Sequence, residues 1–316
     1  MSESLVAPTG IEPAPALVVI ANAPVSFGAF EITIGVDPGV PSGLAVLNAV
    51  AEAGYAGIDL GPVGYLGSGR QLTERLSSRS LGLAGGYLEL PYSDPERLVP
   101  SLVQLDLLLD VFDTVNAHPR PKPTLADAGS DRRRANPGRS AADHSLGFDS
   151  EGWKRFAEGL EQAVDRCRAR GYEPTFHHET GTHIEAPWEI EKVLELTSIG
   201  LCLDSGHLVL GGGDPIQALR DWGERINHVH LKDARKAVLD RIVADRAPVV
   251  EIWRRRAFCA LGKGDVNVDG VIELLNQHHY SGWLVVEQDI LPDSADPRGP
   301  VNDQRANRNY LAELGL

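Results

Sequence analysis

Hydrophobic and polar positions alternate between two periods from residue 16 onward. Short runs rich in Val, Ile and Leu indicate buried strands, and longer stretches with apolar residues every three to four positions indicate helices. The predicted strands occupy residues 16–26, 57–61, 83–90, 113–119, 174–180, 199–207, 226–233 and 282–288. The predicted helices occupy residues 44–55, 71–81, 95–112 and 151–172, and further helices begin at residues 186, 214 and 268 and near residue 302.

Eight strands, each followed by a helical or irregular connection, are typical of a (β/α)8 TIM barrel. Such barrels span about 250 residues plus insertions, which suits this chain of 316 residues. A doubly wound open sheet is the alternative. Because no glycine fingerprint follows the first predicted strand, the barrel is favoured.

Three segments stand outside the repeating unit. Residues 1–15 are rich in proline and predict a flexible leader, so we expect one barrel domain over residues 16–316. The polar composition around residues 119–150 predicts an insertion without packed elements, and a second, irregular insertion covers about 234–262. A polar loop of this length inside a domain is either functional or disordered.

Composition narrows the classes of function. The net charge of −14 argues against nucleic-acid binding, which needs a basic face. No apolar stretch reaches the length of a membrane span, so we expect a cytoplasmic protein that binds no membrane. The three cysteines are scattered, which argues against a disulfide framework or a cysteine metal pair.

Four polar residues recur where the last four predicted strands end, namely Glu179, Asp204, His230 and Glu287. The first two intervals are 25 and 26 residues, about one βα unit each, and the third is 57, one unit plus the second insertion. In a barrel these ends meet at one face, where carboxylates so close together need a cation to stay ionised. Mixed oxygen and nitrogen donors without thiolate predict one divalent ion, Mn²⁺ first, with Co²⁺, Zn²⁺ or Mg²⁺ as alternatives.

Further candidates flank this predicted centre. His207 follows Asp204 by three positions and is expected to face the substrate, and His177 shares a strand face with Glu179. Lys232, Arg235 and Lys236 follow His230 and could hold polar substrate groups. We expect two other histidines, His178 and His228, to face the helices.

The segments "HHETGT", "GLCLDSGHL", "INHVHLKD", "LGKGDVNVDGVIELL" and "GWLVVEQD" together resemble the xylose-isomerase-like sugar isomerase/epimerase superfamily, and most of all its inosose-dehydratase-like branch. The resemblance implies one divalent metal held at Glu179, Asp204, His230 and Glu287, and a substrate-facing histidine at His207. The segment "GAFEITIG" (residues 28–35) and the stretch 120–150 are atypical of the family.

The resemblance also implies a chemistry, proton removal from carbon next to the carbonyl of a keto-sugar or keto-cyclitol. Glu179, Glu287, His207 and His177 are the expected catalytic residues. We expect a lyase that resembles inosose dehydratase. The alternatives are a sugar isomerase or epimerase, or the metal-dependent subunit of a C-glycoside deglycosidase that acts on 3-keto glycosides. The expected partners are a small carbohydrate substrate and further copies of the chain, with a small second subunit as an alternative.

Overall fold

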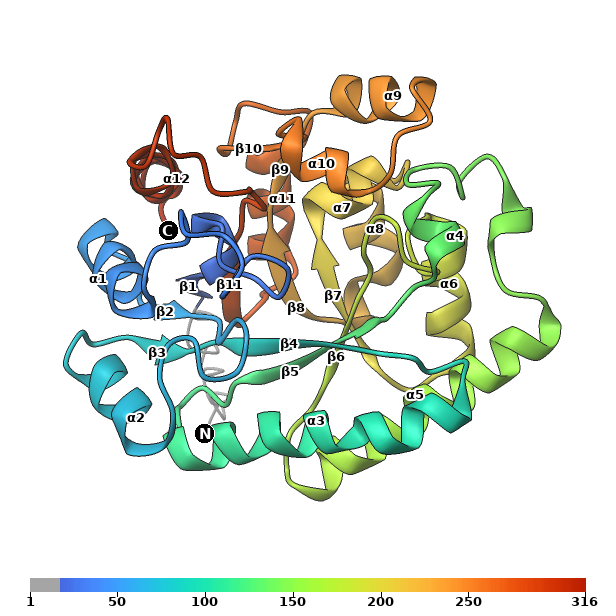
Figure 1. Ribbon diagram of the computed structural model, residues 1–316, viewed down its shortest axis with the longest axis horizontal. Helices are drawn as coiled ribbons and strands as arrows, with labels where there is room; N and C mark the ends of the chain where they lie inside the picture. Colours follow the sequence, from blue (N-terminus) through green and yellow to red (C-terminus); the bar gives the residue numbers. More distant parts are fainter. Residues whose placement is uncertain (1–17) are drawn as a thin grey trace, which may run out of the picture.

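A computed structural model of the chain describes residues 18–316 (Figure 1). Its strands are β1 (Val18–Asn22), β2 (Gly57–Ile58), β3 (Gly82–Leu83), β4 (Gly85–Leu90), β5 (Lys122–Asp127), β6 (Thr175–His177), β7 (Gly200–Asp204), β8 (Ile226–Leu231), β9 (Asp233–Ala234), β10 (Phe258–Cys259) and β11 (Gly282–Val286). Its α-helices are α1 (Gly43–Ala53), α2 (Gly69–Ser77), α3 (Pro95–Val115), α4 (Asp131–Arg134), α5 (Ser150–Ala169), α6 (Pro187–Leu196), α7 (Ser205–Leu210), α8 (Pro215–Trp222), α9 (Lys236–Ala244), α10 (Val250–Arg254), α11 (Val268–Gln277) and α12 (Gly299–Glu313). Three short 3-10 helices, η1 (Pro24–Phe27), η2 (His144–Leu146) and η3 (Gly223–Arg225), complete the elements of this range.

The sheet closes into a barrel at Ala84. Within residues 18–316, nine strand segments pair in parallel in the order β3-β2-β1-β11-β8-β7-β6-β5-β4. Its two ends, β3 and β4, are one stretch of chain interrupted at Ala84. The Ala84 N–H donates to the Ile58 carbonyl on one side, and its carbonyl accepts from the Lys122 N–H on the other. The predicted TIM barrel, with eight strand positions, is therefore confirmed.

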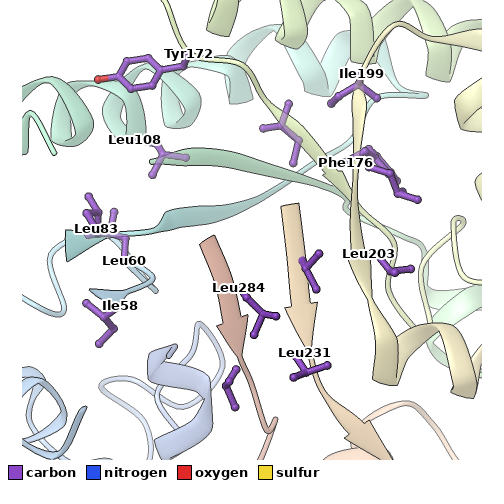
Figure 2. Packing of buried hydrophobic residues seen from close by; sticks show 14 of the residues in the cluster. Ile58, Leu60, Leu83, Leu108, Tyr172, Phe176, Ile199, Leu203, Leu231 and Leu284 are labelled. Carbon is purple, nitrogen blue, oxygen red and sulfur yellow. The ribbon is translucent and has the colours of Figure 1, made fainter. Parts of the chain in front are cut away.

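The main apolar core lies between the barrel and its helices (Figure 2). Leu203, Leu231 and Leu284, on β7, β8 and β11, are fully buried in it. Because side chains alternate across a strand, the neighbouring residues Asp204 and His230 face the barrel interior instead. Helices α3 and α5 run along one side of the sheet, and α9 and α10 (orange) lie at the opposite side of the view (Figure 1).

Trp283 fills the amino-terminal end of the barrel. A Cβ atom added at Gly57 or Gly82 would come within 2.5 and 2.7 Å of its indole ring. Glycine is therefore required at both positions because the ring occupies the space of a side chain. With that end filled, the space available to a ligand lies at the opposite, carboxyl-terminal face of the barrel.

The fourth strand lies later in the sequence than predicted. Residues 113–115 continue α3, and the strand is β5, inside the stretch that we expected to lack packed elements. The polar stretch therefore supplies one wall of the barrel. Pro123 and the flanking charges hid this strand, because proline is depleted in central strands.

The second expected insertion also contains regular structure. Helices α9 and α10 and the antiparallel pair β9–β10 pack around a small core of their own. The predicted leader, residues 1–15, lies outside the described residues. Between residues 18 and 316 no helix is long and apolar enough to cross a membrane.

Candidate metal centre and active site

A cavity opens at the carboxyl-terminal ends of the strands, where barrel enzymes carry their active sites. It is lined on one side by ionisable side chains from β6, β7, β8 and β11 and the loops that follow them. The loop after β1 and the helix α10 supply much of the other side. The space between these walls, counted together with the open solvent at the mouth, is about 610 Å³.

Four buried side chains from four neighbouring strands converge beside this cavity: His177, Asp204, His230 and Glu287. One potential ligand atom from each lies within 4.8 Å of the others. His177 Nε2 is 3.4 Å from Asp204 Oδ2, and His230 Nδ1 is 3.1 Å from Glu287 Oε2. Three of the four predicted ligands are thus brought together, and His177 joins them.

Glu179 is not part of this group. It follows the last residue of β6 by two positions, and its N–H already donates to the Ile184 carbonyl across the turn that follows. Its carboxylate accepts a hydrogen bond of 2.5 Å from the Tyr87 hydroxyl, at the cavity wall. Alternation along β6 predicts that His177 and Glu179 point to the same side, but β6 ends at His177. Glu179 lies beyond the strand, so the group in the structure contains His177 where the sequence predicted Glu179.

Asp204 combines a structural and a chemical role. One carboxylate oxygen, Oδ1, accepts the His207 N–H and caps helix α7. The other oxygen, Oδ2, is buried and faces the converging side chains, 3.4 Å from His177 Nε2. An aspartate at this strand end therefore begins the next helix and still offers a ligand atom.

Lys232 is buried among carboxylates rather than exposed at the rim. Its ammonium lies 3.1 Å from Asp204 Oδ2, 3.1 Å from Glu287 Oε2 and 2.7 Å from Asp289 Oδ1. Burial alone would lower the pKa of Lys232, but the three carboxylates hold it well above its usual value. Burial would likewise raise the pKa of Asp204, and the Lys232 ammonium holds it well below its usual value. The lysine thus keeps these carboxylates ionised.

His207 lines the cavity, and its hydrogen bonds determine which ring nitrogen carries the proton. Its Nδ1 accepts the backbone N–H of Thr180 at 3.2 Å and lies 3.1 Å from the Thr180 hydroxyl. Because Nδ1 accepts, the proton of the neutral ring is on Nε2, which lies 3.4 Å from Asp289 Oδ2. The cavity therefore receives an N–H donor from His207.

The chain matches a family model described as Xylose isomerase-like TIM barrel over residues 47–304. The chain belongs to this family. Inosose dehydratase of Clostridium perfringens (strain 13 / Type A) is 34% identical over 153 residues, which are 48% of this chain and 52% of that protein. The chain spans about half the length of the curated relatives it matches.

Solved structures of the same architecture have lower identity. The probable 3-DHS dehydratase of Bacillus anthracis aligns with a TM-score of 0.65 at 14% identity, over 93% of this chain and 98% of that one. The 3-keto-D-glucoside 4-epimerase of E. coli aligns with a TM-score of 0.59 at 16% identity, over 94% and 98%. At these identities the likeness shows the shared fold alone.

Other candidates in this family member lie away from the cavity. Arg235 and Lys236 are exposed at the start of α9 and do not line the cavity, because the chain turns outward at β9.

His228 was expected to face the helices, but its ring lies 5.1 Å from that of His230. Residues two apart share a strand face, so His228 occupies the layer beneath His230.

Three functional candidates escaped the sequence analysis. Asp289 contacts Lys232 and His207, and its signal was its place two residues after Glu287. Asp59 ends the short second strand, 3.9 Å from His230 Nε2, and burial raises its pKa to about 7. Tyr87 carried no sequence signal, because an aromatic residue in a strand is ordinarily a packing residue.

A buried ion pair anchors the loop that carries Thr180. Arg133 binds both carboxylate oxygens of Glu189 at 2.7 and 3.1 Å, and Ser140 donates to Glu185 and Glu189. Glu185 in turn accepts the Gly181 N–H, next to Thr180. The stretch predicted as a loose insertion therefore supports the active-site loop.

The converging residues fit a divalent cation. They offer two imidazoles and two carboxylates, the donor types of Mn²⁺, Co²⁺ and Zn²⁺ sites. Burial lowers the pKa of His177, which favours the neutral ring that a ligand needs. Neighbouring Cys202 and Glu287 instead hold the pKa of His230 well above its usual value despite its burial, so binding of the cation would release a proton from this ring. Cys202 lies close enough to His177 and His230 to form a second grouping, but burial raises the pKa of its thiol and it stays protonated.

Proposed function

We propose that the chain is a divalent-metal-dependent enzyme that removes a proton from carbon next to the carbonyl of a keto-sugar or keto-cyclitol, with elimination of a leaving group as the outcome. The convergence of His177, Asp204, His230 and Glu287 beside the cavity carries this proposal. The sequence match to inosose dehydratases supports the lyase outcome. A cation bound to these four residues, Mn²⁺ in our proposal, would supply a Lewis acid for oxygen atoms of the substrate.

The remaining groups of the site move and place protons. Glu179 is the base that we assign, because its carboxylate lines the cavity and lies outside the ligand group. Tyr87 holds this carboxylate in place and stays protonated, since burial raises its pKa well above the usual value. His207 offers Nε2–H to a substrate oxygen or to a departing hydroxyl.

Deuterium exchange tests the proposal. With a keto-inositol or a 3-keto glucoside in deuterium oxide, we expect deuterium at the carbon next to the ketone, in product or returned substrate, only when the metal is present. Glu179→Gln should abolish the exchange and retain the metal. Glu158→Gln, an exposed carboxylate of α5 outside the cavity lining, is the matched control and should exchange normally. Turnover of a true substrate with its α-hydrogen fully retained would refute proton abstraction.

A further inference from the structure

Two segments that the proposed chemistry does not explain meet at the cavity. The "GAFEITIG" segment after β1 contributes Phe30, and the second insertion contributes Trp253 on α10. Their rings lie 5.6 Å apart between centroids, with an interplanar angle of 55°, and both line the cavity. Far apart in sequence, they form one aromatic wall.

Both rings are held by local structure. The Phe30 N–H donates to the Thr33 hydroxyl at 3.1 Å, and that hydroxyl donates to the Gly28 carbonyl at 2.6 Å. Gly28 adopts the left-handed conformation, with a φ of 79°, that this tight turn requires. Trp253 packs against the separate small core of the second insertion. Local hydrogen bonds thus fix the backbone that carries Phe30, and the small core supports Trp253.

The cavity is chemically two-sided. The metal-ligand side presents carboxylates, imidazoles and an ammonium. The rest of the lining is largely apolar and includes Pro24, Val25, Ala29, Phe30, Pro62 and Trp253, with the carboxylate of Glu31 next to Phe30. Among these six apolar residues only Trp253 carries a side-chain hydrogen-bonding group, its indole N–H. A free polyol such as a keto-cyclitol carries hydroxyls around its whole edge and would leave several unpaired there.

We infer that the substrate is a keto-sugar that carries an aryl group, with the sugar ring at the metal side and the aryl ring against Phe30 and Trp253. Aromatic pairs favour tilted and offset contacts of the kind this wall offers. The position of the sugar ring in this inference rests on the proposed function, whereas the position of the aryl ring rests on the aromatic wall alone.

Binding of two ligands that differ only in the aryl group tests the proposed aryl site. Phenyl β-glucoside and methyl β-glucoside differ in the aglycone alone, and calorimetry on metal-loaded wild-type protein should show at least tenfold tighter binding of the phenyl compound. Trp253→Ala and Phe30→Ala should each reduce this ratio severalfold, and Trp253→Phe should largely retain it. Ile32→Ala, an exposed residue of the same loop that does not line the cavity, should leave it unchanged.

The same pairing applies to turnover, with 4-nitrophenyl and methyl 3-keto-β-glucosides. We expect the ratio of their kcat/KM values to follow the binding ratio through the variants. Equal binding of the two glucosides by wild-type protein, or a ratio unchanged in Trp253→Ala and Phe30→Ala, would overturn the inference while α-carbon exchange still supported the proposed function. Conversely, an aryl preference in binding without any α-carbon exchange would support the aryl site and refute the proposed chemistry.

Discussion

Removing the buried guanidinium of Arg133 should destabilise the protein strongly. The side chains of Arg133 and Glu189 are 1% and 0% exposed, and the pair is bidentate. Breaking a buried pair from one side costs about 3–5 kcal/mol, because the partner charge stays buried and uncompensated. Arg133→Met preserves the apolar stem and should lower the free energy of unfolding by about this amount.

The chain offers a matched control with the same geometry at the surface. Arg166 binds both carboxylate oxygens of Asp106 at 2.6 and 2.7 Å, with side chains 43% and 33% exposed. Solvent screens such a pair, so Arg166→Met should cost about 0–1 kcal/mol. Urea titrations of both variants and the wild type, followed by circular dichroism, give the two differences directly.

The penalty for Arg133→Met should also depend on pH. Burial raises the pKa of Glu185, and the Arg133 guanidinium acts against this rise. Without the guanidinium the Glu185 carboxylate takes up a proton more readily, so the penalty should shrink as the pH falls toward 5. Equal losses for the buried and surface variants, or a penalty independent of pH, would refute the claim that burial decides the energy of this pair.

Three further predictions concern the site. His177→Ala should weaken metal binding by more than the roughly 10–100-fold loss typical of changing a residue that only hydrogen-bonds to a ligand, whereas Glu179→Gln should keep full metal content. Elemental analysis giving the reverse would restore Glu179 as the ligand. In chelated protein, Asp59→Asn should become more stable than the wild type as the pH rises from about 4 to 7. The folded pKa of about 7 lies above the usual 3.8, so ionisation of the buried carboxyl should cost on the order of 4 kcal/mol above pH 7; a difference constant with pH would contradict the raised pKa. Thr180→Val should lower kcat about fivefold with unchanged metal content, and Thr180→Ser should restore it, because one hydrogen bond to His207 is lost; equal rates in all three proteins would show that the hydroxyl does not position the ring.

The sequence predicted the barrel because most of its strands have clear apolar runs followed by helical periodicity. It misplaced the fourth strand because the apolar spacing of α3 continues into residues 113–115 and because prolines precede and enter β5. The closure at Ala84 was likewise hidden, since no local pattern records that one strand pairs with partners on both sides. Local periodicity therefore locates elements but does not decide which polar stretch is buried.

The ligand set was predictable up to the ends of the strands. Asp204, His230 and Glu287 lie at or next to a strand end, where alternation fixes the side to which a side chain points. Glu179 lies beyond β6, where hydrogen bonds of the following turn decide its direction instead. His177 lies two positions before Glu179, so strand alternation predicts the same side for both residues. Alternation alone therefore could not choose between them, although only His177 lies inside the strand.

Lys232 explains how so many acids can share one buried site. Asp204, Glu287 and Asp289 would carry three negative charges at one buried site, and one ammonium contacts all three. The lysine offsets one of these charges, and the divalent cation of our proposal would offset the remaining two. The sequence predicts Lys232 as a substrate contact, and its place among three carboxylates gives it a further part in the charge balance that keeps them ionised. The sequence contains the residue, but its role follows from burial, which the sequence pattern does not record.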